Sequence, residues 1–184
     1  LILGSTNGYS FILPDQVSEN TIAPKVVFTE FSLSNQSIPI GTFEGRTILS
    51  GPLNDSTTIV RFSYQDKGIQ FSFTTTDYSQ PDKNQFAYRL MGFDTTWRIV
   101  GPEQRFANYS SLPGGEYILE VKASNSDGAW NTLPRSLRIS VSPPFWTTWW
   151  FLLVVISAGI LMVLAMIKFL LNRQKLRFRE HAMA

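Results

Sequence analysis

An uncharged apolar stretch near the C-terminal end of the sequence constrains the fold more than any other feature. Residues 149–167 read WWFLLVVISAGILMVLAMI and contain no charged side chain. As an α-helix rising about 1.5 Å per residue, this stretch is roughly 28 Å long, close to the roughly 30 Å hydrocarbon core of a bilayer. A buried helix of a soluble domain is the alternative, but such helices are usually shorter and keep a polar stripe. The sequence therefore predicts a single transmembrane helix.

Aromatic and basic side chains flank this helix as they do at membrane boundaries. Trp146, Trp149 and Trp150 cluster at its beginning, where indole rings favour the headgroup level, and Lys168 follows its end. Residues 168–184 carry five basic side chains and one acidic side chain. Because basic residues stay on the cytoplasmic side, we expect a cytoplasmic C-terminus and a lipid bilayer as a partner.

The excess of basic residues belongs to this tail alone. The whole chain has a formal net charge of +2, whereas residues 1–145 carry 11 Lys and Arg against 13 Asp and Glu. The part before the helix is therefore slightly acidic, and we do not expect nucleic acid as a partner. A place beside the membrane explains the charges of the tail, and lipid binding by them would be an additional effect.

Apolar and polar side chains alternate in several segments before Pro143, as expected for half-buried β-strands. The clearest strands are residues 59–62, 69–73, 86–90, 117–123 and 137–141. Turns rich in Pro, Gly and Asp separate them. About seven short strands, with no helical period before the tryptophan cluster, predict an all-β antiparallel sandwich.

Two segments before these strands lead to more specific expectations. Val27, Phe31 and Leu33 are expected on one face of an extended segment, with Thr29 between them. Residues 41–54 are rich in turn residues and are expected to form a loop.

The chain contains no cysteine, so aromatic packing must contribute more to the stability of this sandwich. The aromatic residues expected in its core include Phe71, Phe73, Tyr88, Trp97, Tyr117 and Trp130. A sugar-stacking patch of Trp97, Trp130 and Phe93 is the alternative, but aromatic side chains of strands usually pack inward.

The first residues indicate that the sequence is part of a longer protein. Residues 1–22 contain two short strands around Asn7 and Gly8, which we interpret as the end of a preceding domain and a linker. No secretory leader precedes them, and the chain stops abruptly at Ala184. We therefore expect sequence to be missing at both ends.

Residues that could carry chemistry are scarce. The chain has one histidine, His181, which we interpret as an exposed helix residue, and this histidine without cysteine does not make a zinc site. Asp77, Asp82 and Asp94 lie near turns, where Asp bonds its own backbone. No glycine-rich phosphate loop precedes a helix. The sequence predicts no catalytic residue, no metal site and no cofactor for this segment.

Residues 86–130, FAYRLMGFDTTWRIVGPEQRFANYSSLPGGEYILEVKASNSDGAW, resemble the three-tyrosine domain, called Y_Y_Y, of bacterial two-component sensors. The residues that carry the resemblance are Tyr88, Trp97, Tyr109, Tyr117, Gly128 and Trp130. The approach to the membrane, PPFWTTWWF, is also similar to that family, and residues 7–17 resemble the last strand of a β-propeller. The resemblance implies an immunoglobulin-like sandwich after a β-propeller, in the periplasm of a bacterium with its helix in the inner membrane.

This resemblance leads to a division of the chain into four parts. Residues 1–22 end an upstream domain, residues 23–143 form the immunoglobulin-like sandwich, residues 144–168 cross the membrane, and residues 169–184 begin a cytoplasmic helix. From the residues themselves, the three tyrosines are expected in the core or at corners, with their hydroxyl groups bonded to the backbone. Ligand contact by one of them is the alternative.

The sequence supports two functions of different classes. In the first, the segment couples an extracytoplasmic sensor domain to a cytoplasmic output domain of a sensor histidine kinase in the same chain. In the second, it is a membrane-anchored carbohydrate-binding or adhesion domain without kinase output. Met162, Phe169, Leu176 and Met183 are spaced by seven residues and suggest a parallel homodimer, although chance spacing explains them equally well.

Overall fold

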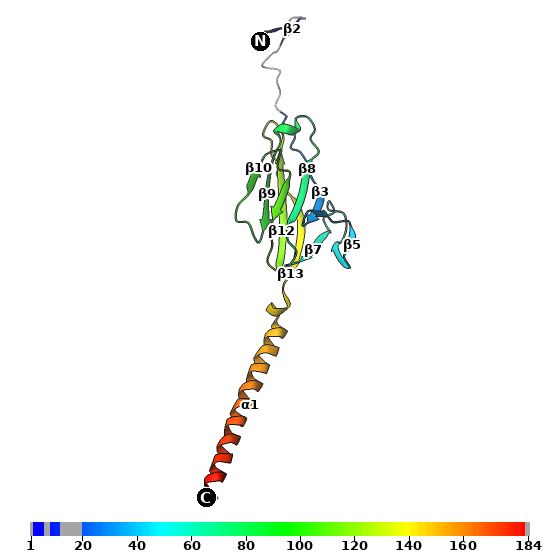
Figure 1. Cartoon of the computed structure of the whole chain (residues 1–184). Helices are drawn as coiled ribbons and strands as arrows, with labels where there is room; N and C mark the ends of the chain where they lie inside the picture. The colour runs from blue at the N-terminus through cyan, green and yellow to red at the C-terminus, as the bar shows by residue number, and fades with distance from the viewer. Residues whose placement is uncertain (1, 6–7, 12–19, 183–184) are drawn as a thin grey trace. The chain divides into compact units, whose positions relative to one another are not determined.

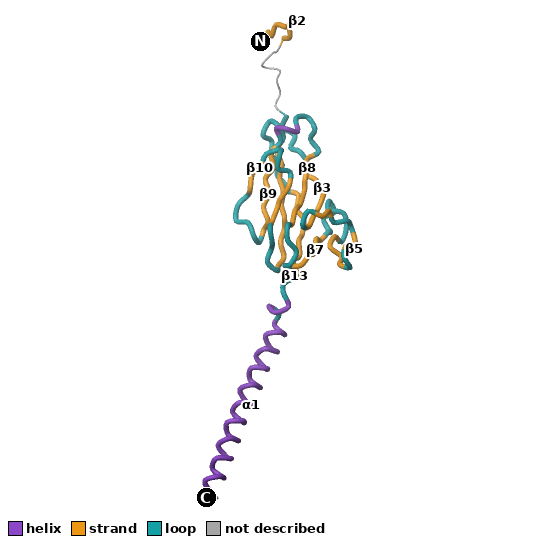
Figure 2. Tube along the Cα trace, viewed as in Figure 1, coloured by secondary structure: helices purple, strands orange, loops and turns teal. Residues whose placement is uncertain are grey.

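The computed structural model describes residues 2–5, 8–11 and 20–182, with side chains from residue 20 to residue 170. It divides the chain into two compact units, Leu1–Ser142 and Pro143–Ala184. The first unit consists of β-strands with one short 3-10 turn at Pro81–Lys83, and the second is helical (Figure 1, Figure 2). Each unit is described by itself.

Two facing sheets form the sandwich of the first unit. The larger sheet has the strand order β10-β9-β12-β13-β7-β6-β5, and the smaller has the order β11-β8-β3-β4. The strands are β3 Val26–Leu33, β4 Gln36–Ser37, β5 Gly41–Phe43, β6 Arg46–Leu49, β7 Ile59–Ser63, β8 Ile69–Thr75, β9 Gln85–Met91, β10 Arg98–Val100, β11 Phe106–Tyr109, β12 Gly115–Ser124 and β13 Arg135–Ser142. The predicted all-β sandwich is confirmed.

The predicted hairpin at the beginning of the chain is also present. Strands β1 Ile2–Ser5 and β2 Gly8–Phe11 pair in an antiparallel two-stranded sheet. Residues 12–19, which include the rest of the predicted linker, lie outside the described residues.

One pair of strands departs from the antiparallel prediction. β13 pairs with β7 in parallel, with Arg138 opposite Ile59 and Ser142 opposite Ser63, whereas the other described pairs are antiparallel. Alternation with a period of two predicts which face of a strand is buried, but it is the same for both directions of pairing. The sheet is therefore mixed at this pair.

A β-bulge changes the buried face of β3. The register against β8 shifts between Phe28 and Glu30, and Val26, Phe28, Phe31 and Leu33 are buried. The expectation that Val27 shares a face with Phe31 is therefore wrong, because the bulge inserts one extra residue and reverses the alternation.

The segment 41–54, expected to be a loop, contains a short hairpin. β5 and β6 are joined by Glu44 and Gly45, both of which have positive φ angles, as in the tight turns that suit hairpins. Ile48 and Leu49 are buried in the core. Phe43, which packs against the core, Ile48 and Leu49 are the large apolar residues of this hairpin, and they do not alternate with polar residues in a way that reveals two strands.

The core lies between the two sheets and is rich in aromatic side chains. Phe31 stacks on Phe71 with 4.8 Å between ring centroids, and Phe73 lies 5.3 Å from Phe86. Trp97 and Trp130, which were expected in the core, are only partly buried. The fully buried side chains are Phe31, Phe71, Phe73, Phe86, Ile48, Ile69, Leu90, Leu112, Leu119, Leu137, Ile139 and Val60.

The second unit confirms a helix long and apolar enough to cross a membrane. α1 comprises Trp149–Ala182 after a short 3-10 turn at Phe145–Thr147. Within it, Trp149–Leu170 has a mean hydropathy of 2.7, and none of it is buried. Ser157 donates its hydroxyl hydrogen to the Val154 carbonyl at 2.9 Å, so this polar group is satisfied inside the helix. The side chains of Leu176 and His181, and Met183 entirely, lie outside the described residues.

Replacing Ile139 by Ala is expected to destabilise the sandwich, because this fully buried side chain of β13 packs between the sheets. The free energy of unfolding in urea should fall by about 2 to 5 kcal/mol. Ile99→Ala is the matched control, since Ile99 is 69% exposed on β10 and its loss should cost less than about 0.5 kcal/mol. Equal effects of both changes would contradict the assignment of the core.

Candidate functional site

The sandwich has two ends, and the chain enters at one and leaves at the other. Residues 20–25, which lead into β3, are called the link, and the end of the sandwich at which they enter is called the link end. There the β12 residue Ser124 lies opposite Gln85, and the following Asn125 bonds the link. At the exit end, Gly115 of β12 lies opposite Val141, and β13 stops at Ser142. β12 and β13 therefore run the length of the sandwich between the two ends (Figure 1).

The carboxylate of Asp94 organises the exit end. Its Oδ2 accepts the backbone N–H of Leu90 at 2.9 Å and the hydroxyl hydrogen of Tyr109 at 2.8 Å. Its Oδ1 accepts from the Arg98 guanidinium at 2.6 Å, and only 6% of the Asp94 side chain is exposed. A buried carboxylate is tolerated when it is paired and hydrogen-bonded, and Asp94 satisfies both conditions.

Tyr109 joins this carboxylate to the smaller sheet. It ends β11, its ring is buried, and Phe93 meets that ring edge-on at 5.8 Å between centroids. Burial of the ring, followed by the hydrogen bond to Asp94, raises the pKa of Tyr109 above its usual range. The phenol is therefore a fixed hydrogen-bond donor at neutral pH.

Tyr117 closes the same end from the larger sheet. Its hydroxyl donates to the Pro113 carbonyl at 3.0 Å and so fixes the turn that precedes β12. Gly92 has a φ angle of +93°, and a Cβ there would lie 3.1 Å from the Tyr117 ring. Glycine at this turn therefore allows both the backbone conformation and the close approach of the ring.

Tyr88 lies deeper, on the inner face of β9. Its ring is buried and lies 6.1 Å from that of Phe73 on the facing sheet. The structure thus places Tyr88, Tyr109 and Tyr117 in the core or at corners. The hydroxyl of Tyr109, however, donates to a carboxylate, where a backbone partner was expected.

Trp97 lies over the outer face of β9 and β12. The cationic groups of Arg89 and Lys122 both lie 4.5 Å from its ring centroid, and Arg89 also pairs with Glu120 at 2.7 Å. Cation–π contacts therefore hold this ring on the sheet surface, which explains why it is not in the core.

The other two motif residues belong to the link end. Gly128 has a φ angle of +84° in the turn between β12 and β13, and Trp130 forms a β-bridge with Ser124. Phe93 lies beyond the far end of β9, so the structure does not gather Trp97, Trp130 and Phe93 into one patch.

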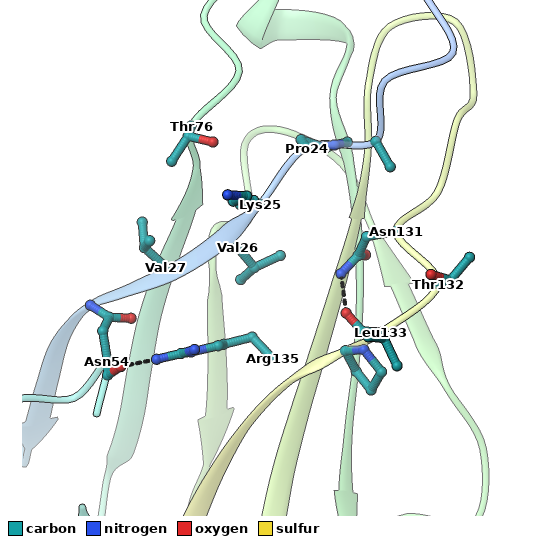
Figure 3. A pocket seen from close by; sticks show the side chains of 12 residues that line it. Pro24, Lys25, Val26, Val27, Asn54, Thr76, Asn131, Thr132, Leu133 and Arg135 are labelled. Carbon is teal, nitrogen blue, oxygen red and sulfur yellow. Dashed lines mark hydrogen bonds between the residues drawn. The ribbon is translucent and has the colours of Figure 1, made fainter. Parts of the chain in front are cut away.

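A groove of about 490 Å³ lies at the link end, beside the beginning of β3 (Figure 3). Asn54 spans the bulge of β3, because its side chain accepts from Phe28 N at 2.8 Å and donates to Phe28 O at 2.7 Å. The Arg135 guanidinium, at the beginning of β13, donates to the backbone carbonyl of Asn54. This side of the groove therefore ties the two sheets together.

The residues predicted at the membrane boundary lie in the second unit. Trp146, Trp149 and Trp150 are exposed, as is Lys168. Among the described residues, no group of three His, Cys, Asp or Glu could hold a metal ion.

Sequence reasoning missed the shared role of Asp94. It predicted a turn aspartate bonded to nearby backbone, and the Leu90 bond is of that kind. The spacing of Asp94 and Arg98 suggests an ion pair, but no sequence signal connects Asp94 to Tyr109, fifteen residues away.

Stability above neutral pH tests the Tyr109 assignment. The pKa of the phenol is about 10 in the unfolded chain and is raised in the folded protein, where the phenol keeps its proton to higher pH. Above about pH 10 the unfolded state therefore binds fewer protons, and the free energy of unfolding falls as pH rises. In Tyr109→Phe this fall should be shallower, while stability at pH 7 should drop by about 1.5 to 3 kcal/mol.

Urea unfolding at several pH values measures both effects. Tyr78→Phe is the control, because Tyr78 is 80% exposed and should change neither quantity. An unaltered alkaline slope in Tyr109→Phe would contradict the assignment.

Comparison with known families and relatives agrees with this geometry. Residues 77–142 match the Y_Y_Y domain, from before β9 to the end of β13, and all six motif residues fall inside the match. Histidine kinase P4 of Formosa agariphila is 32% identical over 177 residues, which are 96% of this chain and 12% of that protein.

Solved structures share the fold. The extracellular domain of a candidate one-component system from B. thetaiotaomicron is 25% identical, with a TM-score of 0.57 over 78% of this chain and 19% of its own. Two extracellular domains of candidate hybrid two-component systems from that organism are 24% and 26% identical, with TM-scores of 0.56 and 0.55. The matches cover 77% and 75% of this chain, but only 20% and 18% of the length of the two extracellular domains. Residues 77–142 therefore form a Y_Y_Y domain, which supplies strands β9 to β13 of the sandwich.

Proposed function

We propose that this chain is the membrane-proximal transducing segment of a bacterial sensor histidine kinase. Its sandwich, residues 23–143, couples an upstream ligand-sensing domain, which ends at about residue 22, to a cytoplasmic output domain beyond residue 184. Residues 144–168 cross the inner membrane once, and residues 169–184 begin the cytoplasmic part. Both partner domains belong to the same polypeptide.

The observation that carries this proposal is the extent of the match to a histidine kinase. An alignment over 96% of this chain must include both the sandwich and the apolar helix. Both units therefore align with one continuous segment of a histidine kinase. This supports a role for both units in a sensor of that kind.

The arrangement of the sandwich supports coupling. The chain enters at the link end and leaves at the exit end, and β12 and β13 connect the two ends through the centre of the larger sheet. After Ser142 the sequence continues with Pro143 and Pro144, whose fixed φ angles make a short, stiff step to the helix. Motion of the sandwich is transmitted through such a step better than through a flexible linker.

The orientation follows from the flanking residues. Lys168 and the basic side chains after it favour the cytoplasm, and the slightly acidic sandwich lies in the periplasm. Exposed tryptophans at the beginning of α1 contact the lipid headgroups. A parallel homodimer is part of the proposal, and the seven-residue spacing of Met162, Phe169, Leu176 and Met183 in the sequence supports it.

Inserting four glycines after Ser142 in the full-length protein is expected to abolish the response to stimulus, because the stiff step to the helix becomes flexible. A panel of soluble polysaccharides supplies the stimulus, and phosphate transfer to the output domain is measured in membranes. The control carries the same insertion between Pro39 and Ile40, which are exposed in the connection between β4 and β5. A full response in the Ser142 variant would refute coupling through this step.

A further inference from the structure

The side chain of Asn125 connects the incoming link to the turn between β12 and β13. Its amide nitrogen donates to the carbonyl of Asn20 and, at 3.1 Å, to that of Ile22. Its oxygen accepts the backbone N–H of Asp127 at 3.0 Å and that of Ala129 at 2.9 Å. Only 1% of Asn125 is exposed, and the whole hydrogen-bonding capacity of its amide is used.

A second contact reinforces this connection. Asp127, in the same turn, accepts the backbone N–H of Asn20 at 2.7 Å through Oδ2. Asn20 in turn accepts the N–H of Ile22 at 3.0 Å, which orders the link just before it enters β3. Three hydrogen bonds from one turn therefore hold two link residues.

The link is also fastened to the smaller sheet, but further along the chain. The Lys25 carbonyl accepts from Thr76 N at 3.0 Å and extends the pairing of β3 with β8. Residues 20 to 22, before that point, are held by the turn of the larger sheet. Their direction is thus set by the β12–β13 hairpin, whose second strand ends at Ser142.

We propose that Asn125 is a positioning residue that latches the incoming link onto the β12–β13 hairpin. The latch fixes the direction from which the preceding part of the protein meets the sandwich. It attaches that part to the strand that leads to the membrane helix. The inference rests on the proposed coupling function and names the point at which movement enters the sandwich.

Asparagine suits this position for a specific reason. Its two donors bond the link and its acceptor builds the turn. Aspartate has nearly the same shape and keeps the acceptors, but it has no N–H to donate. Asn125→Asp therefore breaks the bonds to the link and leaves the bonds inside the turn.

The same chain offers a matched control. Asn131 accepts from Ala123 N of β12 at 2.8 Å and donates to the Leu133 carbonyl at 2.6 Å, so both of its bonds stay within the β12–β13 hairpin. Asn131→Asp makes the same chemical change and adds the same charge, but it removes no bond to the link. A second test variant, Asp127→Ala, removes the acceptor of Asn20 N–H and leaves Asn125 unchanged.

The test measures the distance between spin labels at Thr21→Cys and Ser136→Cys in the full chain in lipid nanodiscs. Both positions are exposed, and the chain has no other cysteine. The unchanged chain and Asn131→Asp should each give one narrow distance distribution. Asn125→Asp should lose it and give a broad distribution, and Asp127→Ala should broaden it less.

Amide hydrogen exchange separates a latch from a residue that only builds the turn. In Asn125→Asp the amides of Asp127 and Ala129 should stay protected, because the carboxylate still accepts from them. A narrow distribution in Asn125→Asp, equal broadening in Asn131→Asp, or loss of protection at both turn amides would each overturn the proposal. These readouts require no stimulus, so their failure is distinct from a failure of the glycine insertion, which tests coupling itself.

Discussion

An apolar helix that no part of the described chain covers is the constraint on which the rest of this molecule depends. The window Trp149–Leu170 exposes large side chains all around, and none of it is buried. Leaving so much apolar surface in water would cost about 25 cal/mol for each Å². A lipid bilayer would remove that cost.

The sandwich is held together without disulfides, through an aromatic core and a polar network at each end. At the exit end, Asp94 accepts hydrogen bonds from strand β9, from Tyr109 of the smaller sheet and from Arg98. At the link end, Asn125 gathers the incoming chain and its own turn. Each network uses a buried polar group whose partners come from separate segments. Such groups are costly when unpaired, so they favour one arrangement of the ends.

Much of this architecture follows from the sequence because it rests on local patterns. Alternation predicted β8, β9, β12 and β13, and an uncharged run predicted the helix. The bulge in β3 was not predicted, because one inserted residue reverses the alternation of apolar and polar side chains and no residue pattern in the sequence marks its position. Trp97 was misplaced for a related reason. Its position depends on Arg89 and Lys122, which come together only when β9 and β12 pair. The same limit applies to the candidate site: its residue types were evident in the motif, but the Asp94 to Tyr109 bond depends on tertiary structure.

Membrane topology is the most direct test of the account, because coupling between two compartments requires the sandwich and the C-terminal end of α1 on opposite sides of the membrane. Single cysteines at Ser56, exposed in the sandwich, and at Arg177, beyond the apolar window, can be introduced into a chain that has none. A membrane-impermeant maleimide applied to spheroplasts should label Ser56→Cys, and it should label Arg177→Cys only after permeabilisation. Equal labelling of both positions in intact spheroplasts, or protection of both, would contradict the account.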